Sequence, residues 1–329
     1  MVLFVIPGIA TFAGGADAAT RAEILAPARQ DVQMTPTLLA TLSSLSFGAG
    51  DFFGGVAAKR ADLLYVILVN QIAAFISLLL AAYLLSPFLL PTQDLALAAL
   101  AGVTTAIAIP ALYKSLAMGP MSIVAPITAL VSILLPVAYG VLILGETPNW
   151  QTLAGFAVGG CAVFLLGGGD RMIELFKPGT AARPVSLRGI AYALVAGFCI
   201  AAFYVFMKRC SPQSGLWPLV VARVVAMTAM AVLAGLRHRR QPVTWPARQL
   251  TMLIVLSGAL DGAGNAFYLL AAHGGALSVV STITSLYPAT TILFARYILG
   301  ERISLPQAIG VCSALAAIVV IVSSLPSSG

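Results

Sequence analysis

Two aspartates and one arginine fall inside long apolar stretches, where an ionised side chain is costly and usually marks a functional site. Asp51 lies in the sequence GDFFG, and Asp261 lies in GALDG with Asn265 one helical turn later. Glycines four residues apart beside a carboxylate let another backbone or a ligand approach closely. These glycines therefore predict either a cavity at each aspartate or, as the alternative, close helix packing alone.

Arg223 lies about two turns into another apolar stretch. Its long side chain could reach the membrane interface or form an ion pair, and Asp261 is the expected partner because a short link joins the two segments. If the pair separates when substrate binds, an amine or a carboxylate could replace one member. A carboxylate there could also exchange protons; an Asp261→Asn variant with unchanged pH dependence of transport would contradict that role.

Other polar side chains in apolar stretches are weaker candidates for substrate contact. Tyr113 and Tyr268 belong either to a cavity wall or to an interfacial aromatic belt, and Asn70 and Gln71 are polar residues of one predicted helix. Lys114 is expected to reach the membrane interface instead of a substrate.

Patterns for cofactor or metal chemistry are lacking in the sequence. There is no P-loop GxxxxGK[ST], the four cysteines form no CxxC pair, and only two histidines occur. We therefore expect no cofactor, no metal and no catalytic residue. A membrane-embedded enzyme is disfavoured because it would need a cluster of histidine, cysteine or acidic residues.

Composition places these residues in a membrane. Of 329 residues, 60% are hydrophobic and 9% are charged, and the mean hydropathy is +1.00. One soluble core of this size could not bury so much apolar surface, so lipid must act as solvent. The net charge of +7 comes from short loop clusters such as residues 237–240, which suit lipid headgroups and not nucleic acid.

Ten apolar segments have the length needed to span a bilayer. The predicted bounds are Thr37–Ala57, Leu63–Leu85, Leu95–Ala117, Met121–Leu144, Trp150–Leu166, Leu187–Met207, Leu216–Leu236, Leu250–Ala272, Ala276–Leu299 and Leu305–Val322. Several contain proline, which frees a carbonyl that a cavity or a neighbouring helix must satisfy. The small-residue spacings Gly155-x-x-x-Gly159 and Gly310-x-x-x-Ala314 predict packing seams, either within the chain or in a homodimer.

An internal repeat organises the segments. With an offset of 155 residues, Tyr113 aligns with Tyr268, and Leu-Gly-Glu ending at Glu146 aligns with Leu-Gly-Glu ending at Glu301. Both glutamates are expected at helix ends, in contact with loop groups. Since each half holds five segments, the second half enters the membrane in the opposite orientation. The prediction is an all-α integral membrane protein whose ten transmembrane helices form two inverted five-helix repeats.

The predicted domains are an N-terminal extension at 1–34, repeats at 35–168 and 187–324, and a linker at 169–186. The extension begins with an apolar run too short to span and without the basic start of a signal peptide. A true start at Met34 is the preferred interpretation, which detection of an intact Met1 peptide by mass spectrometry would contradict.

Three stretches resemble the EamA type of the drug/metabolite transporter superfamily: SFGAGDFFGGVAAKR at 46–60, ALYKSLAMGPMSIVAPI at 111–127 and SLYPATTILFARYILGE at 285–301. The resemblance extends over both halves. It implies a basket of ten helices in which segments 1–4 and 6–9 line a central cavity and segments 5 and 10 are peripheral. Members move amino acids, other metabolites or drugs, often outward.

The expected function is a secondary carrier of a small metabolite, amino acid or drug in the bacterial plasma membrane, working by alternating access with proton or exchange coupling. A lipid-headgroup or polyprenyl carrier is an alternative. Positive residues gather in cytoplasmic loops, and their count here favours both termini outside, whereas the family resemblance implies both inside. A reporter enzyme fused after Gly329 would decide.

Overall fold

The computed structural model describes residues 35–118, 121–166, 187–238, 247–300 and 304–324. Within these ranges the chain is helical and contains no strand. The predicted extension at 1–34, the predicted linker at 169–186 and Glu301 lie outside the described residues.

Six helices are long and apolar enough to cross a membrane, as judged by length and composition. They are α3 (Leu63–Leu85), α4 (Thr92–Met118), α5 (Met121–Leu142), α8 (Leu187–Arg209), α10 (Arg248–Gly274) and the pair α11 (Leu277–Thr284) with α12 (Tyr287–Leu299). Shorter apolar stretches form α6 (Trp150–Leu166), most of α9 (Trp217–His238) and most of α13 (Leu305–Ser324). Helix α2 (Pro36–Ala58) and the short 3-10 turn η2 (Pro212–Ser214) complete the described elements, so each predicted apolar segment is helical.

The predicted segment Ala276–Leu299 is helical but is divided in two. The chain divides there into α11 and α12 at Ser285 and Leu286. Pro288 occupies the first turn of α12 and has no N–H group to continue the ladder of the preceding helix. Leu286 N–H instead donates to the carbonyl of Ile283 at 3.1 Å, a tightened turn that joins the two pieces.

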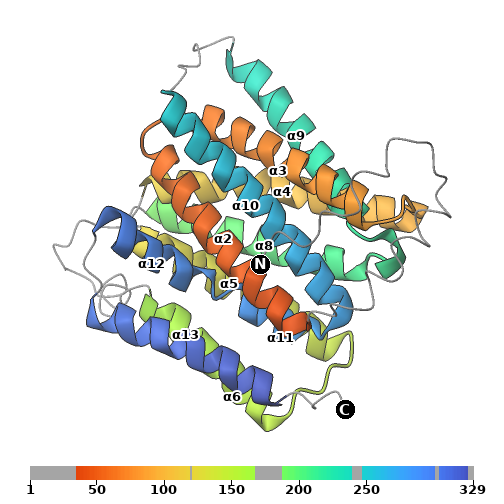
Figure 1. Ribbon diagram of the computed structural model, residues 1–329, viewed down its shortest axis with the longest axis vertical. Helices are drawn as coiled ribbons and strands as arrows, with labels where there is room; N and C mark the ends of the chain where they lie inside the picture. Colours follow the sequence, from red (N-terminus) through yellow and green to blue (C-terminus); the bar gives the residue numbers. More distant parts are fainter. Residues whose placement is uncertain (1–34, 119–120, 167–186, 239–246, 301–303, 325–329) are drawn as a thin grey trace, which may run out of the picture. The chain divides into compact units, whose positions relative to one another are not determined.

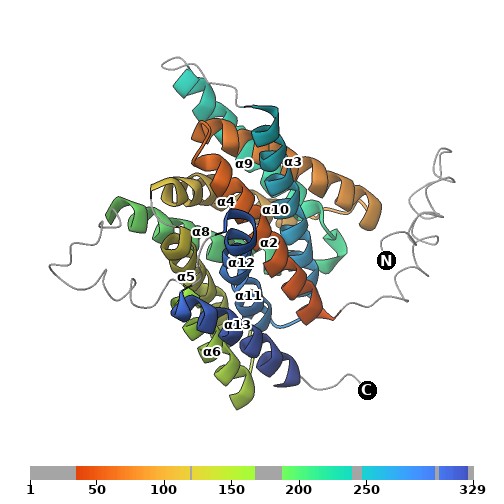
Figure 2. The same cartoon turned by 60° about the vertical axis from the view of Figure 1, so that its left-hand side comes forward.

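The closest helix packing joins the two halves of the chain. Helix α2, the first of the first half, packs against α10, and α8, the first of the second half, packs against α4. Helix α3 likewise packs against α10, and α9 packs against α4. Helices α6 and α13 pair with each other, side by side in both views (Figures 1 and 2). Contacts between helices of the same half are much sparser.

Glycines permit these close approaches. A Cβ on Gly258 of α10 would fall on the backbone carbonyl of Asn70 in α3, and a Cβ on Gly54 of α2 would lie 2.6 Å from the Tyr113 hydroxyl. Gly310 of α13 similarly lies against the backbone of α6, where an added Cβ would be 2.7 Å from Leu166 N. The glycines therefore serve packing, and the predicted seam at Gly155 and Gly310 joins α6 to α13 within one chain.

Gly258→Ala is expected to lower the free energy of unfolding by about 1–3 kcal/mol, because the added methyl group meets backbone that cannot rotate away. Thermal unfolding in detergent measures the effect. The matched control is Gly160→Ala on α6, which has nothing within 4 Å of the added Cβ. That control should be neutral or stabilising by up to about 1 kcal/mol; equal losses for both variants would contradict the packing argument.

The link between α10 and α11 is held by two charged side chains from other helices. The Glu146 carboxylate, beyond the end of α5, accepts from Leu277 N at 2.6 Å and from Ser278 N at 3.0 Å. The Lys208 ammonium, at the end of α8, donates to the carbonyls of Ala272 at 2.5 Å and Gly275 at 2.8 Å. We call these four contacts the end clamp. Glu146 was predicted to contact loop groups; that prediction is wrong in its partner, because both amides belong to the first turn of α11.

Candidate functional site

A cavity of about 70 Å³ lies between helices of both halves. Its polar lining consists of Asp51, Thr105, Tyr113, Tyr204, Arg223, Asp261, Asn265 and Tyr287. Its apolar lining includes Phe47, Ala108, Ile109, Leu112, Ile200 and Phe203. The space holds about two water molecules, well below the ~300–1,000 Å³ of sites for drug-sized ligands. The described conformation is therefore contracted around the site.

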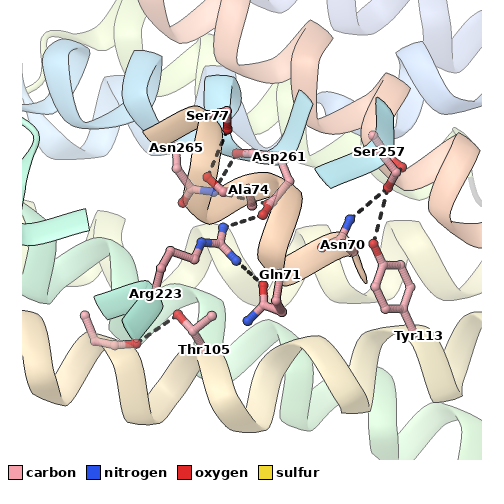
Figure 3. A network of polar contacts seen from close by, with 12 residues as sticks. Asn70, Gln71, Ala74, Ser77, Thr105, Tyr113, Arg223, Ser257, Asp261 and Asn265 are labelled. Atoms are coloured by element: carbon pink, nitrogen blue, oxygen red, sulfur yellow. Dashed lines mark hydrogen bonds and ion pairs between the residues drawn. The ribbon is translucent and has the colours of Figure 1, made fainter. Parts of the chain in front are cut away.

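An ion pair crosses one side of the cavity. The Arg223 guanidinium, 5% exposed, donates to the Asp261 carboxylate, 17% exposed, and also to the side-chain carbonyl of Gln71 (Figure 3). Asn265 Nδ2 donates to the Asp261 carboxylate at 3.1 Å and to its backbone carbonyl at 2.7 Å. Helices α3, α9 and α10 are thus joined through one network, and the predicted pairing of Arg223 with Asp261 is present.

Ser257 connects a second group of polar side chains beside the pair. Its hydroxyl donates to the carbonyl of Gly50 at 2.7 Å and accepts from Asn70 Nδ2 at 3.0 Å (Figure 3). The Tyr113 hydroxyl lies 3.5 Å from Ser257 Oγ. These contacts tie α2, α3 and α4 to α10 and fix the cavity wall next to Asp51.

Asp51 differs from the paired aspartate. Its side chain lines the cavity and is neither fully buried nor exposed. It forms no hydrogen bond or ion pair with any described residue, and the charge that acts on it most strongly is the like charge of Asp261. A carboxylate with these neighbours is complementary to a cation in the cavity.

Most of the residues predicted as candidates meet at this cavity. Asp51, Tyr113, Arg223, Asp261 and Asn265 line it. The remaining candidates, Asn70, Gln71 and Tyr268, lie behind its wall and are buried.

Tyr268 occupies neither of its two expected positions. It stacks on the ring of Tyr204 at 4.1 Å between centroids and donates from its hydroxyl to the Tyr204 carbonyl at 3.2 Å. It thus supports the wall without forming it. Lys114 is exposed, with its ammonium 4.6 Å from the Tyr192 ring centroid, and it does not belong to the cavity lining.

Two helices depart from the arrangement that the family resemblance implies. Peripheral positions for α6 and α13 agree with the expectation, since neither contributes to the cavity lining. Helices α3 and α5 were also expected to line it, yet none of its lining residues comes from them. Gln71 and Asn70 of α3 act through Arg223 and Ser257 instead.

Sequence reasoning missed two tyrosines of the lining, Tyr204 and Tyr287, and also Phe47 and Phe203. Tyr204 lies near the end of its apolar segment, where an interfacial tyrosine would also be expected, but Tyr287 lies in the middle of its segment. That position is a signal for a polar cavity, because a buried phenol usually finds a hydrogen-bond partner.

Comparison with known proteins gives two findings. The model of the EamA-like transporter family matches residues 34–168 and again residues 187–323. One solved crystal structure of a protein superimposes with a TM-score of 0.66 at 16% sequence identity, covering 87% of this chain and 95% of that chain. That likeness concerns the fold alone. Comparison with curated proteins gives no significant match.

Proposed function

Because this chain belongs to the EamA-like transporter family, and is thus a membrane transporter of the drug/metabolite superfamily, we propose that it exports a small solute by alternating access through the described cavity. The observation that carries the proposal is the buried site itself. Two carboxylates and a guanidinium meet in an aromatic cavity between the two family-matched halves. Charges are rarely kept at such depth without a role in transport.

We further propose that the halves are inverted repeats of five spans each. Pro36, at the start of α2, lies against Gly275, and Lys208, at the end of α8, binds the carbonyl of that same glycine. Contact of the start of α2 and the end of α8 with one glycine supports opposite directions for the first helices of the two halves. The matched packing of α2 with α10 and of α4 with α8 supports the same symmetry.

The transport cycle requires the cavity to open alternately at its two ends. The contracted volume of about 70 Å³ and the end clamp support a conformation in which access at the clamped end is closed. Pro110 in α4 and Pro126 and Pro136 in α5 provide positions where helices bend, and the break before Pro288 separates α11 from α12. The proposed location is the bacterial plasma membrane.

An efflux screen in proteoliposomes tests the transport proposal. Vesicles are loaded with a defined mixture of amino acids, amines, carboxylates and quaternary cations, and their depletion is followed by mass spectrometry. We expect saturable loss of a chemically related subset, and a reduction of about tenfold or more in Arg223→Met, which breaks the site's ion pair. Arg188→Met, at the exposed start of α8, should retain full activity. Absence of flux for every solute would contradict the proposal.

Proton coupling is proposed through Asp261, because a proton on this carboxylate would release Arg223. Efflux is measured across a range of pH with and without a pH gradient. Asp261→Asn, which keeps the shape of the side chain, should remove the effect of the gradient. A variant that transports with the same pH dependence as the natural chain would contradict the coupling role.

A further inference from the structure

The cavity holds more carboxyl groups than cationic groups. Within the described chain its charged lining residues are Asp51, Asp261 and Arg223, so two carboxylates face one guanidinium. Asp261 and Arg223 satisfy each other, which leaves Asp51 as the unbalanced group. Lys114 is not a lining residue, and its ammonium lies 4.6 Å from the Tyr192 ring centroid.

Arg223 is poorly available to an anionic ligand. Its guanidinium already donates to Asp261 and Gln71, and its side chain is 5% exposed. A ligand carboxylate would have to displace Asp261, which would then remain buried with only Asn265 as a partner. Leaving one member of a buried pair without its counter-charge is strongly unfavourable.

The remaining wall suits a cation with an apolar body. Phe47, Tyr113, Phe203, Tyr204 and Tyr287 surround the carboxylates. Aromatic faces attract ammonium groups electrostatically and also bury apolar surface well. The same aromatic faces do not attract the carboxylate of a ligand.

From this arrangement we propose that Asp51 binds the ammonium group of an amine with an aromatic or similarly apolar body, and that the site rejects the same body when it carries a carboxylate. The inference rests on the proposed function, since it names the cargo class of the transport cavity. Because the described volume is contracted, the body enters only when the walls move apart.

Three probes that share one phenyl-ended body separate the charge types: 2-phenylethylamine, phenylalanine and 3-phenylpropionate. Their binding to the purified protein is measured by calorimetry in detergent, so no transport is needed. We expect saturable binding of 2-phenylethylamine, with phenylalanine and 3-phenylpropionate weaker by roughly tenfold or more, since a charge-assisted hydrogen bond is lost or opposed.

Asp51→Asn should weaken 2-phenylethylamine binding by roughly tenfold or more and reduce its preference over phenylalanine. Since Asp51 has no described partner to lose, this variant should fold normally, which its thermal midpoint verifies. Asp62→Asn is the matched control: Asp62 caps α3 through the amides of Leu64 and Tyr65, and asparagine caps equally well. Its binding should equal that of the natural chain.

The outcomes separate the two proposals. Amine binding that depends on Asp51 without any flux supports the inference and counts against transport. Flux of some solute while 2-phenylethylamine fails to bind, or binds more weakly than phenylalanine, overturns the inference and leaves transport standing. Unchanged amine binding in Asp51→Asn also overturns it.

Discussion

Arg223→Met is expected to destabilise the protein by about 3–5 kcal/mol, the usual effect of removing one partner from a buried ion pair. Methionine fills much of the space of the arginine stem, so the loss comes from charge and not from an empty volume. Asp261 would be left buried without a counter-charge, and Gln71 would lose the donor to its carbonyl. The free energy of unfolding, or the thermal midpoint in detergent, measures the change.

A double variant decides whether the pair is responsible. Arg223→Met combined with Asp261→Asn removes the uncompensated charge and should recover about half of the loss or more. Arg188→Met, an arginine change at the exposed start of α8, should have little effect on stability. If the double variant loses more stability than Arg223→Met and Asp261→Asn lose when their separate losses are added, the pair is not the origin of the effect.

Lys208→Met is expected to open the clamped end and to raise the reactivity of Cys210, two residues further along. The natural Cys210 is buried, and burial, together with the charge of Asp94, raises the pKa of its thiol to about 12. Methionine cannot bind the carbonyls of Ala272 and Gly275. One charge-assisted hydrogen bond contributes about 1.5–3 kcal/mol, so the open population should rise about tenfold or more.

A water-soluble maleimide measures this opening in a chain where Cys161, Cys199 and Cys312 are replaced by alanine. At pH 8 the buried thiol is almost entirely protonated, whereas a thiol released to water has a pKa of about 8.5 and reacts readily. Arg209→Met serves as control, because the Arg209 guanidinium donates to the Tyr139 hydroxyl at 2.9 Å and takes no part in the end clamp. Equal labelling in the two variants would contradict the role of Lys208.

The ion pair could be predicted from sequence because lipid forces a buried charge to find a partner. Arg223 and Asp261 lie on consecutive segments, which left few alternatives. Gln71 as a second partner could not be predicted, since an almost uniformly apolar segment does not reveal which of its faces meets which neighbour.

The internal repeat predicted the order of the helices better than it predicted the surroundings of single residues. Tyr113 and Tyr268 occupy equivalent positions, yet Tyr113 faces the cavity and Tyr268 stacks behind Tyr204. The same family model matches both halves, but their side chains differ, so an equivalent position need not have an equivalent neighbour. The division between α11 and α12 was likewise hidden, because a proline inside an apolar segment does not show whether the helix bends there or a new helix begins.

The preference of helices for partners in the opposite half has a consequence for biosynthesis. Helices α2, α4 and α6 find their main partners in α10, α8 and α13, all of which are made later. At about 5–20 residues per second, the ribosome completes residues 187–323 several seconds or more after it completes residues 34–168. During this interval the glycine faces of the first half must rest against lipid or the insertion machinery. Assembly of the cavity is therefore a late, post-insertion event, and a ribosome that stalls before α8 releases a half-protein whose packing surfaces have no partner.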